Sequence, residues 1–188
     1  VGMLSAGGGL AAYIYTSYMQ KYLFNTVGFD KATATYIIAA ALIWFTLMQP
    51  LFGALADRFG RKPMLLLFGI GGAIVAAPTF LKLETVTSPI VATLLILVPL
   101  TFQAGYTANN ALVKAELFPA HIRGLGVALP YAIGNAIFGG TVEMVALGLK
   151  GAGVEWLFYF YVAAVIGMAG IATLLLPETK ERSLIVED

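Results

Sequence analysis

The sequence predicts an all-α membrane protein built from six transmembrane helices. Of its 188 residues, 60% are hydrophobic and only 11% are charged, whereas about 25% of the residues of an average soluble domain are charged. A soluble fold of about this size still exposes about 30% of its chain surface, and this chain has too few polar residues to cover that surface. We therefore expect lipid to surround most of its side chains.

Runs without Asp, Glu, Lys or Arg divide the chain into six segments. Each is long enough to cross a hydrocarbon core of about 30 Å, which takes about 20 helical residues. In lipid each segment must be a helix, because an isolated strand would leave its backbone amides without partners. The predicted spans are approximately 2–24, 33–56, 63–81, 89–112, 124–148 and 156–177, followed by a cytoplasmic tail at 178–188.

Proline and glycine agree with this division. Pro63 and Pro89 lie at predicted helix starts and Pro177 ends the last span, as expected of a residue without an amide proton. The glycines at 7–9 and 139–140 let helix backbones approach closely. Either they serve tight packing, or the first and fifth spans bend or slide there.

The distribution of Lys and Arg predicts the orientation, because cytoplasmic loops carry an excess of both. Seven lie on the side that holds the chain ends and four on the opposite side, so we expect both termini in the cytoplasm. The membrane itself is expected to be the inner (cytoplasmic) membrane. The first group is Arg58, Arg61, Lys62, Lys114, Arg123, Lys180 and Arg182, and the second is Lys21, Lys31, Lys82 and Lys150.

Several function classes are excluded by composition. There is no cysteine, and the lone His121 has no clustered carboxylates, so we expect no disulfide, no metal site and no cofactor. No nucleophile–base pair or phosphate-binding loop is visible, so we expect neither an enzyme nor ATP hydrolysis. The chain contains no basic run interleaved with aromatic residues, so we do not expect it to bind nucleic acid. Val1 stands in an apolar run without a basic n-region, so we expect a cut point and no signal peptide.

The segment 53–62 (GALADRFGRK) carries the most specific motif. Its glycines suit a short hairpin, and its cations suit a cytoplasmic face. A positive-inside anchor without moving parts is one interpretation. The order G-x-x-x-D-R-x-G-R-K is more specific than an anchor requires, and it resembles the signature loop of the major facilitator superfamily, found between helices 2–3 and 8–9.

Other motifs place the chain within that superfamily. Residues 116–126 (ELFPAHIRGLG) and 177–180 (PETK) resemble the loop 10–11 and C-terminal motifs of its sugar-porter and metabolite:proton symporter branches. Residues 18–23 (YMQKYL) and 131–147 (YAIGNAIFGGTVEMVAL) are similar to the α-ketoglutarate permease group of those symporters. The resemblance implies the C-terminal half, helices 7–12, of a transporter that imports a small dicarboxylate anion with protons.

The resemblance also implies partners and a gate. The N-terminal six-helix bundle of the same transporter would complete the cavity, so this chain is not expected to transport alone. Charge pairs would close the cytoplasmic side and break when it opens; a static anchor is the alternative. The gate residues are Asp57, Arg58, Arg61, Glu116, Arg123, Glu178 and Arg182.

Glu143 is the only acid with long apolar sequence on both sides. It shares one helical face with Tyr131, Asn135 and Gly139, which suits a cavity wall. Burial favours the neutral form of a carboxyl group, and a carboxylate repels a dicarboxylate, so Glu143 is a candidate proton site rather than a substrate ligand. The alternative is a structural acid that pairs near the outer surface, for instance with Lys150 or Lys21.

Two more spans carry polar faces that predict cavity lining. In the first, Lys21 either reaches the headgroups or attracts an anionic substrate. In the fourth, interhelical hydrogen bonds account for one or two members. The faces comprise Tyr13, Thr16, Ser17, Gln20, Lys21 and Phe24 in the first span and Gln103, Tyr106, Thr107, Asn110 and Lys114 in the fourth. Trp156, Tyr159 and Tyr161 are interpreted as an aromatic belt.

The substrate class stays open at this point. A carrier of citrate, shikimate or betaine/proline in the same family fits the same motifs. A sensor or structural membrane protein on this fold is a different class, against which the three polar faces argue, because a sensor has no need of a transmembrane cavity.

Overall fold

The computed structural model describes residues 1–176, and within them the chain is helical without any β-strand. The α-helices are α1 (Gly2–Tyr13), α2 (Met19–Tyr22), α3 (Lys31–Phe59), α4 (Arg61–Leu66), α5 (Ala73–Leu83), α6 (Pro89–Glu116), α7 (Ala120–Gly134), α8 (Val142–Gly151) and α9 (Trp156–Leu175). π-Helical turns join some of them: η1 (Ile14–Tyr18), η2 (Leu23–Val27), η3 (Leu67–Gly72) and η4 (Asn135–Gly139). The prediction of an all-α fold is confirmed.

Five helical segments of residues 1–176 are long and apolar enough to cross a membrane: Lys31–Phe59, Arg61–Leu83, Pro89–Glu116, Ala120–Gly151 and Trp156–Leu175. They correspond to five of the six predicted spans. The predicted span 2–24 falls on a continuous helical segment from α1 to η2, rich in glycine and tyrosine, which is not among the five. Its crossing of the membrane stays a prediction.

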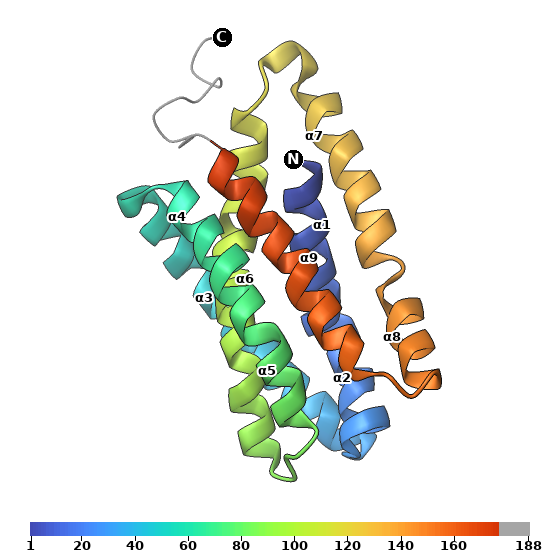
Figure 1. The fold of residues 1–188 in the computed structure, drawn as a ribbon. Helices are drawn as coiled ribbons and strands as arrows, with labels where there is room; N and C mark the ends of the chain where they lie inside the picture. The colour runs from blue at the N-terminus through green and yellow to red at the C-terminus, as the bar shows by residue number, and fades with distance from the viewer. Residues whose placement is uncertain (177–188) are drawn as a thin grey trace.

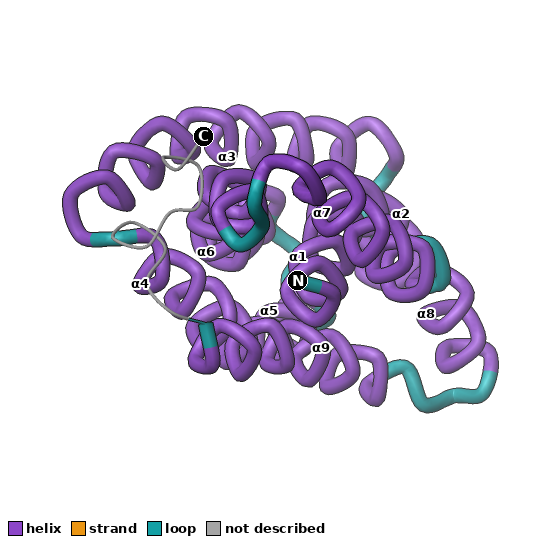
Figure 2. Tube along the Cα trace, turned by 90° about the horizontal axis from the view of Figure 1, so that it is seen from above, coloured by secondary structure: helices purple, strands orange, loops and turns teal. Residues whose placement is uncertain are grey.

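The segment that begins the chain lies inside the bundle. Figure 2 shows α1 between α6, α7 and α9, and its side chains from Leu4 to Ala11 are mostly buried. Figure 1 shows the α3–α4 turn, the α6–α7 turn and the N-terminus at one end of the bundle, and the α5–α6 and α8–α9 turns at the other. We call these the α3–α4 end and the α5–α6 end. This up-and-down order brings segments distant in sequence to the same depth.

Glycines allow the closest helix crossings. A Cβ added to Gly69 in η3 would lie 2.2 Å from Gly170 Cα in α9, and one added to Gly7 would lie 2.6 Å from Ala169 Cβ. Without a hydrophobic driving force between helices in lipid, such close backbone contact is a main source of packing energy. The tight-packing interpretation of the glycine at position 7 is therefore supported.

Asp30 begins α3 as its N-cap. Its carboxylate accepts hydrogen bonds from the Thr33 hydroxyl at 2.5 Å and the Thr33 amide at 3.0 Å. Both bonds favour the charged form and so hold the pKa of Asp30 below its ordinary value, and the bond from the Thr33 hydroxyl has the larger effect. A carboxyl whose pKa is lowered by folding stabilises the fold above its ordinary pKa and loses that contribution as the pH falls through the lowered value.

We expect Asp30→Ala to lower the thermal unfolding temperature at pH 7, because the first turn of α3 loses its cap. The difference from wild type should shrink as the pH falls below the pKa of Asp30. Unfolding scans of the detergent-purified protein at pH 7 and at a pH below the pKa of Asp30 measure it, with Asp30→Ser, another good cap, as the control. A deficit that grows in acid would contradict the assignment.

Candidate functional site

We call the continuous helix from α1 to η2, residues 2–27, the first helical segment. A pocket of about 360 Å³ lies between it and the α7–η4 segment. It gathers predicted cavity residues from two spans, since Tyr13 and Ser17 face Tyr131 and Asn135 across it. The full lining is Gly9, Ala12, Tyr13, Thr16, Ser17, Tyr131, Asn135, Gly139 and Gly140. Two of the three polar faces therefore meet, as two walls of one pocket.

The two walls approach most closely at Gly9. A Cβ added there would lie 1.8 Å from Asn135 Oδ1. That oxygen is buried and has no hydrogen-bond partner within the described residues. An unsatisfied buried acceptor is costly, and this one lies where the two walls of the pocket meet. Asn135 also begins η4, and π-helical turns are frequent at functional sites.

An ion pair connects the first helical segment to α8. Lys21 Nζ lies 2.6 Å from Glu143 Oε1, and the Tyr13 hydroxyl donates to Glu143 Oε2 at 3.0 Å. The Glu143 side chain is 28% exposed, so this ion pair is partly accessible, and it lies beside the pocket through Tyr13. Lys21 and Lys150 were both possible structural partners by sequence, and the structure selects Lys21. The role of Glu143 in proton transfer stays a prediction.

Among the predicted cavity residues outside the pocket lining, Gln103 and Gln20 each bond to another helix. Gln103 is fully buried, and its amide donates to Gly8 O at 3.2 Å, so it joins α6 to α1. Gln20 donates to the Thr35 hydroxyl of α3 at 2.8 Å. Helical spacing placed both on polar faces, but their partners are on other helices and could not be identified from that spacing.

Three other members of the α6 face, Tyr106, Asn110 and Lys114, form a cluster around the Lys114 ammonium, whereas Thr107 bonds to Gln103. Lys114 Nζ donates to the Tyr106 hydroxyl and to Asn110 Oδ1, each at 3.1 Å. It also lies 4.6 Å from the centroid of the Tyr131 ring, which reaches over from α7. Sequence reasoning counted Lys114 as a cytoplasmic cation and as one member of a stripe. The spacing of four residues from Tyr106 to Asn110 to Lys114 was the available signal for a cluster.

Basic side chains bind the helix termini at the α3–α4 end. Arg61, the first residue of α4, forms an ion pair with Glu116, the last residue of α6, which is 3% exposed. Lys62 Nζ donates to Leu174 O at 3.0 Å and to Leu176 O at 2.5 Å, at the C-terminus of α9. These contacts satisfy carbonyls that a helix end leaves open. Arg61 and Lys62, the last two residues of the 53–62 motif, thus connect α4 to the ends of α6 and α9.

The other predicted gate residues occupy the same end. Arg123 Nε in α7 donates to Ala115 O and Phe118 O, each at 3.1 Å, and so connects α7 to the end of α6. Asp57 and Arg58 are exposed on the last turn of α3, with Arg58 over the Phe59 ring. The two remaining predicted gate residues, Glu178 and Arg182, lie outside the described residues.

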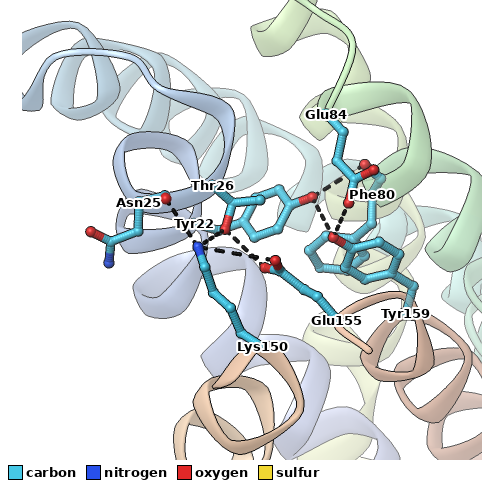
Figure 3. A network of polar contacts seen from close by, with 8 residues as sticks. All are labelled: Tyr22, Asn25, Thr26, Phe80, Glu84, Lys150, Glu155 and Tyr159. Atoms are coloured by element: carbon cyan, nitrogen blue, oxygen red, sulfur yellow. Dashed lines mark hydrogen bonds and ion pairs between the residues drawn. The ribbon is translucent and has the colours of Figure 1, made fainter. Parts of the chain in front are cut away.

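A polar network connects four helical segments at the α5–α6 end (Figure 3). The Tyr22 and Tyr159 hydroxyls lie 3.0 Å apart, and Tyr159 donates to Glu84. The belt interpretation of Tyr159 is therefore wrong: its side chain is fully buried. Its partners are 75 and 137 residues away in sequence, which spacing along one helix cannot show.

A second group of polar contacts lies at the α8–α9 turn (Figure 3). Lys150 donates to the Thr26 hydroxyl at 2.7 Å and to Asn25 O at 3.0 Å, and Thr26 donates to Glu155 at 2.8 Å. Lys150 is thus engaged with the end of the first helical segment and does not reach Glu143. Among the described residues, no group of three or more His, Asp or Glu side chains is placed to hold a metal ion.

Comparison with known proteins identifies relatives over nearly the whole chain. The family described as "Sugar (and other) transporter" matches residues 1–187. The chain is 45% identical over 172 residues to the alpha-ketoglutarate permease of Escherichia coli (strain K12), a match that covers 92% of this chain and 40% of the permease. No solved structure gives a significant match.

Two other relatives are more distant. The ectoine/proline transporter ProP of Corynebacterium glutamicum is 31% identical, with 93% of this chain and 35% of that protein covered. The proline/betaine transporter of Escherichia coli (strain K12) is 27% identical, with 92% and 34% covered. The chain therefore spans between 34% and 40% of the length of these three relatives.

Proposed function

Because the chain belongs to the sugar (and other) transporter family, within the major facilitator superfamily, we propose that it is the C-terminal half of a proton-coupled symporter for a small dicarboxylate such as α-ketoglutarate. The observation that carries this proposal is the 45% identity to the alpha-ketoglutarate permease, against 31% and 27% for the proline-type relatives. The polar pocket beside the Lys21–Glu143 pair supports it.

The mechanism we propose is alternating access, in which one bundle rocks against the other around a central site. The pocket-lining face of the first helical segment and α7 forms one wall. An N-terminal six-helix bundle of the same transporter supplies the other, so this chain alone does not transport. We place both of its ends in the cytoplasm and the α5–α6 end outside, in keeping with the excess of Lys and Arg at the α3–α4 end.

In this scheme the α3–α4 end is the cytoplasmic gate. The Arg61–Glu116 pair and the Arg123 contacts hold the ends of α4, α6 and α7 together. A helix terminus held by charged hydrogen bonds can be released as a unit when those bonds break. Asp57 and Arg58, which lie at the same turn, complete the proposed gate, together with Glu178 and Arg182 of the C-terminal tail.

We expect Glu116→Gln in the full-length transporter to shift the population toward the cytoplasm-open state, because breaking a buried ion pair costs about 3–5 kcal/mol. A cysteine at the pocket residue Ala12 then reacts several-fold faster with a membrane-impermeant thiol reagent in inside-out vesicles. Glu155→Gln, which removes an acid at the opposite end, is the control. Equal labelling rates in both variants would discard the gating role.

The test of the substrate is uptake of labelled α-ketoglutarate by the full-length transporter in proteoliposomes under an imposed pH gradient. We expect uptake that needs an acidic outside and that unlabelled dicarboxylates suppress. Competition by citrate, shikimate, proline and betaine separates the alternatives within the family. Suppression by proline and betaine, with none by dicarboxylates, would reject the dicarboxylate in favour of the zwitterion carried by the relatives named for proline.

A further inference from the structure

Lys114 is the one buried lysine among residues 1–176, with 1% of its surface exposed. It lies only two residues before the end of α6. A lysine so close to the membrane surface ordinarily extends its stem toward water. The side chain of Lys114 does not follow this rule, and the direction it takes is the first indication of a function.

The ammonium group points back into the membrane. Its hydrogen-bond partners are Asn110 and Tyr106, one and two turns earlier on α6. With a rise of 1.5 Å per residue, Tyr106 lies about 12 Å deeper along the helix axis than Lys114. The charge is thus drawn away from the headgroups, toward the level of the pocket, at a cost that a membrane anchor would not incur.

The hydrogen-bond and ring contacts of Lys114 within residues 1–176 are all with neutral groups. They are a hydroxyl, an amide oxygen and the faces of the Tyr106 and Tyr131 rings at 5.5 and 4.6 Å. No carboxylate of the described residues lies within ion-pair distance of it; Glu143, Glu116 and Glu155 pair with Lys21, Arg61 and Lys150. A buried charge without a counter-ion is unfavourable. The cluster is therefore one anion short of charge balance.

One residue connects this cluster to the pocket. The Tyr131 ring covers the Lys114 ammonium on one side and lines the pocket on the other. It is 45% exposed, so it has room to turn. A rotation about its side-chain bonds, a fast motion for an exposed ring, would open the ammonium to a solute in the pocket.

We propose that Lys114 is the cation that binds one carboxylate of the transported solute, with the Tyr131 ring covering it when the pocket is empty. This inference rests on the proposed function, since it assigns a residue to the recognition of the dicarboxylate. The cluster has one cation and can therefore bind a single carboxylate. The Lys114 ammonium supplies the charge, and the Tyr106 hydroxyl can turn and donate to the same anion. The other carboxylate of the solute lies elsewhere in the cavity.

The test compares substrates that lack one carboxylate each, in the full-length transporter. In 2-oxopentanoate a methyl group replaces the distal carboxylate of 2-oxoglutarate, and in 4-oxopentanoate a methyl group replaces the carboxylate beside the keto group. We expect Lys114→Met to lower the affinity of the transporter for 2-oxoglutarate, and for one of the two monoacids, by at least about tenfold. The monoacid that lacks the bound carboxylate should compete as well as with wild type. Lys114→Arg keeps the charge and should retain more affinity than Lys114→Met.

Each outcome has a distinct meaning. An unchanged affinity for 2-oxoglutarate in Lys114→Met overturns the assignment of Lys114 and leaves the proposed function intact. Equal weakening of both monoacids assigns Lys114 to the structure of the cluster and also overturns the inference. A wild-type transporter that takes up a zwitterion and ignores 2-oxoglutarate overturns the proposed function itself. The amount of each variant in the membrane is measured alongside, so that loss of protein is not counted as loss of affinity.

Discussion

Replacing Gly69 by alanine should destabilise the transporter more than the same replacement at Gly170 or Gly148. The new Cβ would lie 2.2 Å from Gly170 Cα and 2.5 Å from Gly170 N. Both obstacles are backbone atoms, so no side chain can turn aside, and α9 must move away from η3. Overpacking of this kind typically costs about 1–3 kcal/mol and occasionally more. The unfolding temperature of the purified full-length protein in detergent measures the effect.

The two other glycines make the prediction graded. Gly170→Ala approaches the Gly69 backbone at 2.9 to 3.2 Å, so its effect should be smaller. Gly148→Ala in α8 meets nothing within 4 Å and serves as the matched control; we expect it to be neutral or slightly stabilising, because alanine is the better helix former. If Gly69→Ala unfolded at the same temperature as Gly148→Ala, the close crossing of η3 and α9 would be wrong.

The second large effect is expected from Glu143→Gln, which should abolish accumulation of solute driven by a pH gradient while leaving solute exchange in place. Each coupled proton permits about tenfold accumulation per pH unit, since one unit corresponds to about 1.4 kcal/mol. Glutamine resembles the protonated acid and cannot release a proton. It also leaves Lys21 without this carboxylate. Proteoliposomes with and without a pH gradient, and with unlabelled solute inside for exchange, separate the two activities.

The matched control for Glu143→Gln is Glu155→Gln, because Glu155 is likewise paired with a lysine, Lys150, but accepts a hydrogen bond from Thr26 outside the pocket lining. It should keep pH-driven accumulation. Retained accumulation in Glu143→Gln would reject Glu143 as the proton site and leave the structural pair with Lys21 as its role. Loss of both accumulation and exchange would show that the Lys21–Glu143 contact is needed for the transport cycle as a whole.

Much of this architecture follows from the sequence because lipid imposes it locally. A charge-free run of about 20 residues in lipid has only one way to satisfy its own backbone, so helices at 33–56, 63–81 and 89–112 were predictable without knowing their neighbours. The residues sharing a helical face were predictable for the same reason. Tyr13 and Ser17 on one helix, and Tyr131 and Asn135 on another, do line a common pocket.

Pairings between helices were not predictable in this way, because they depend on which faces meet and at what depth. The sequence by itself determined the helices, their polar faces, the family and the presence of Glu143 among apolar residues. Only the tertiary structure decided that Glu143 meets Lys21, 122 residues away, that Tyr159 is buried, and that Lys114 points inward beneath Tyr131. The physical reason is that backbone hydrogen bonding acts within one segment, whereas packing and charge pairing act between segments that only the folded bundle brings together.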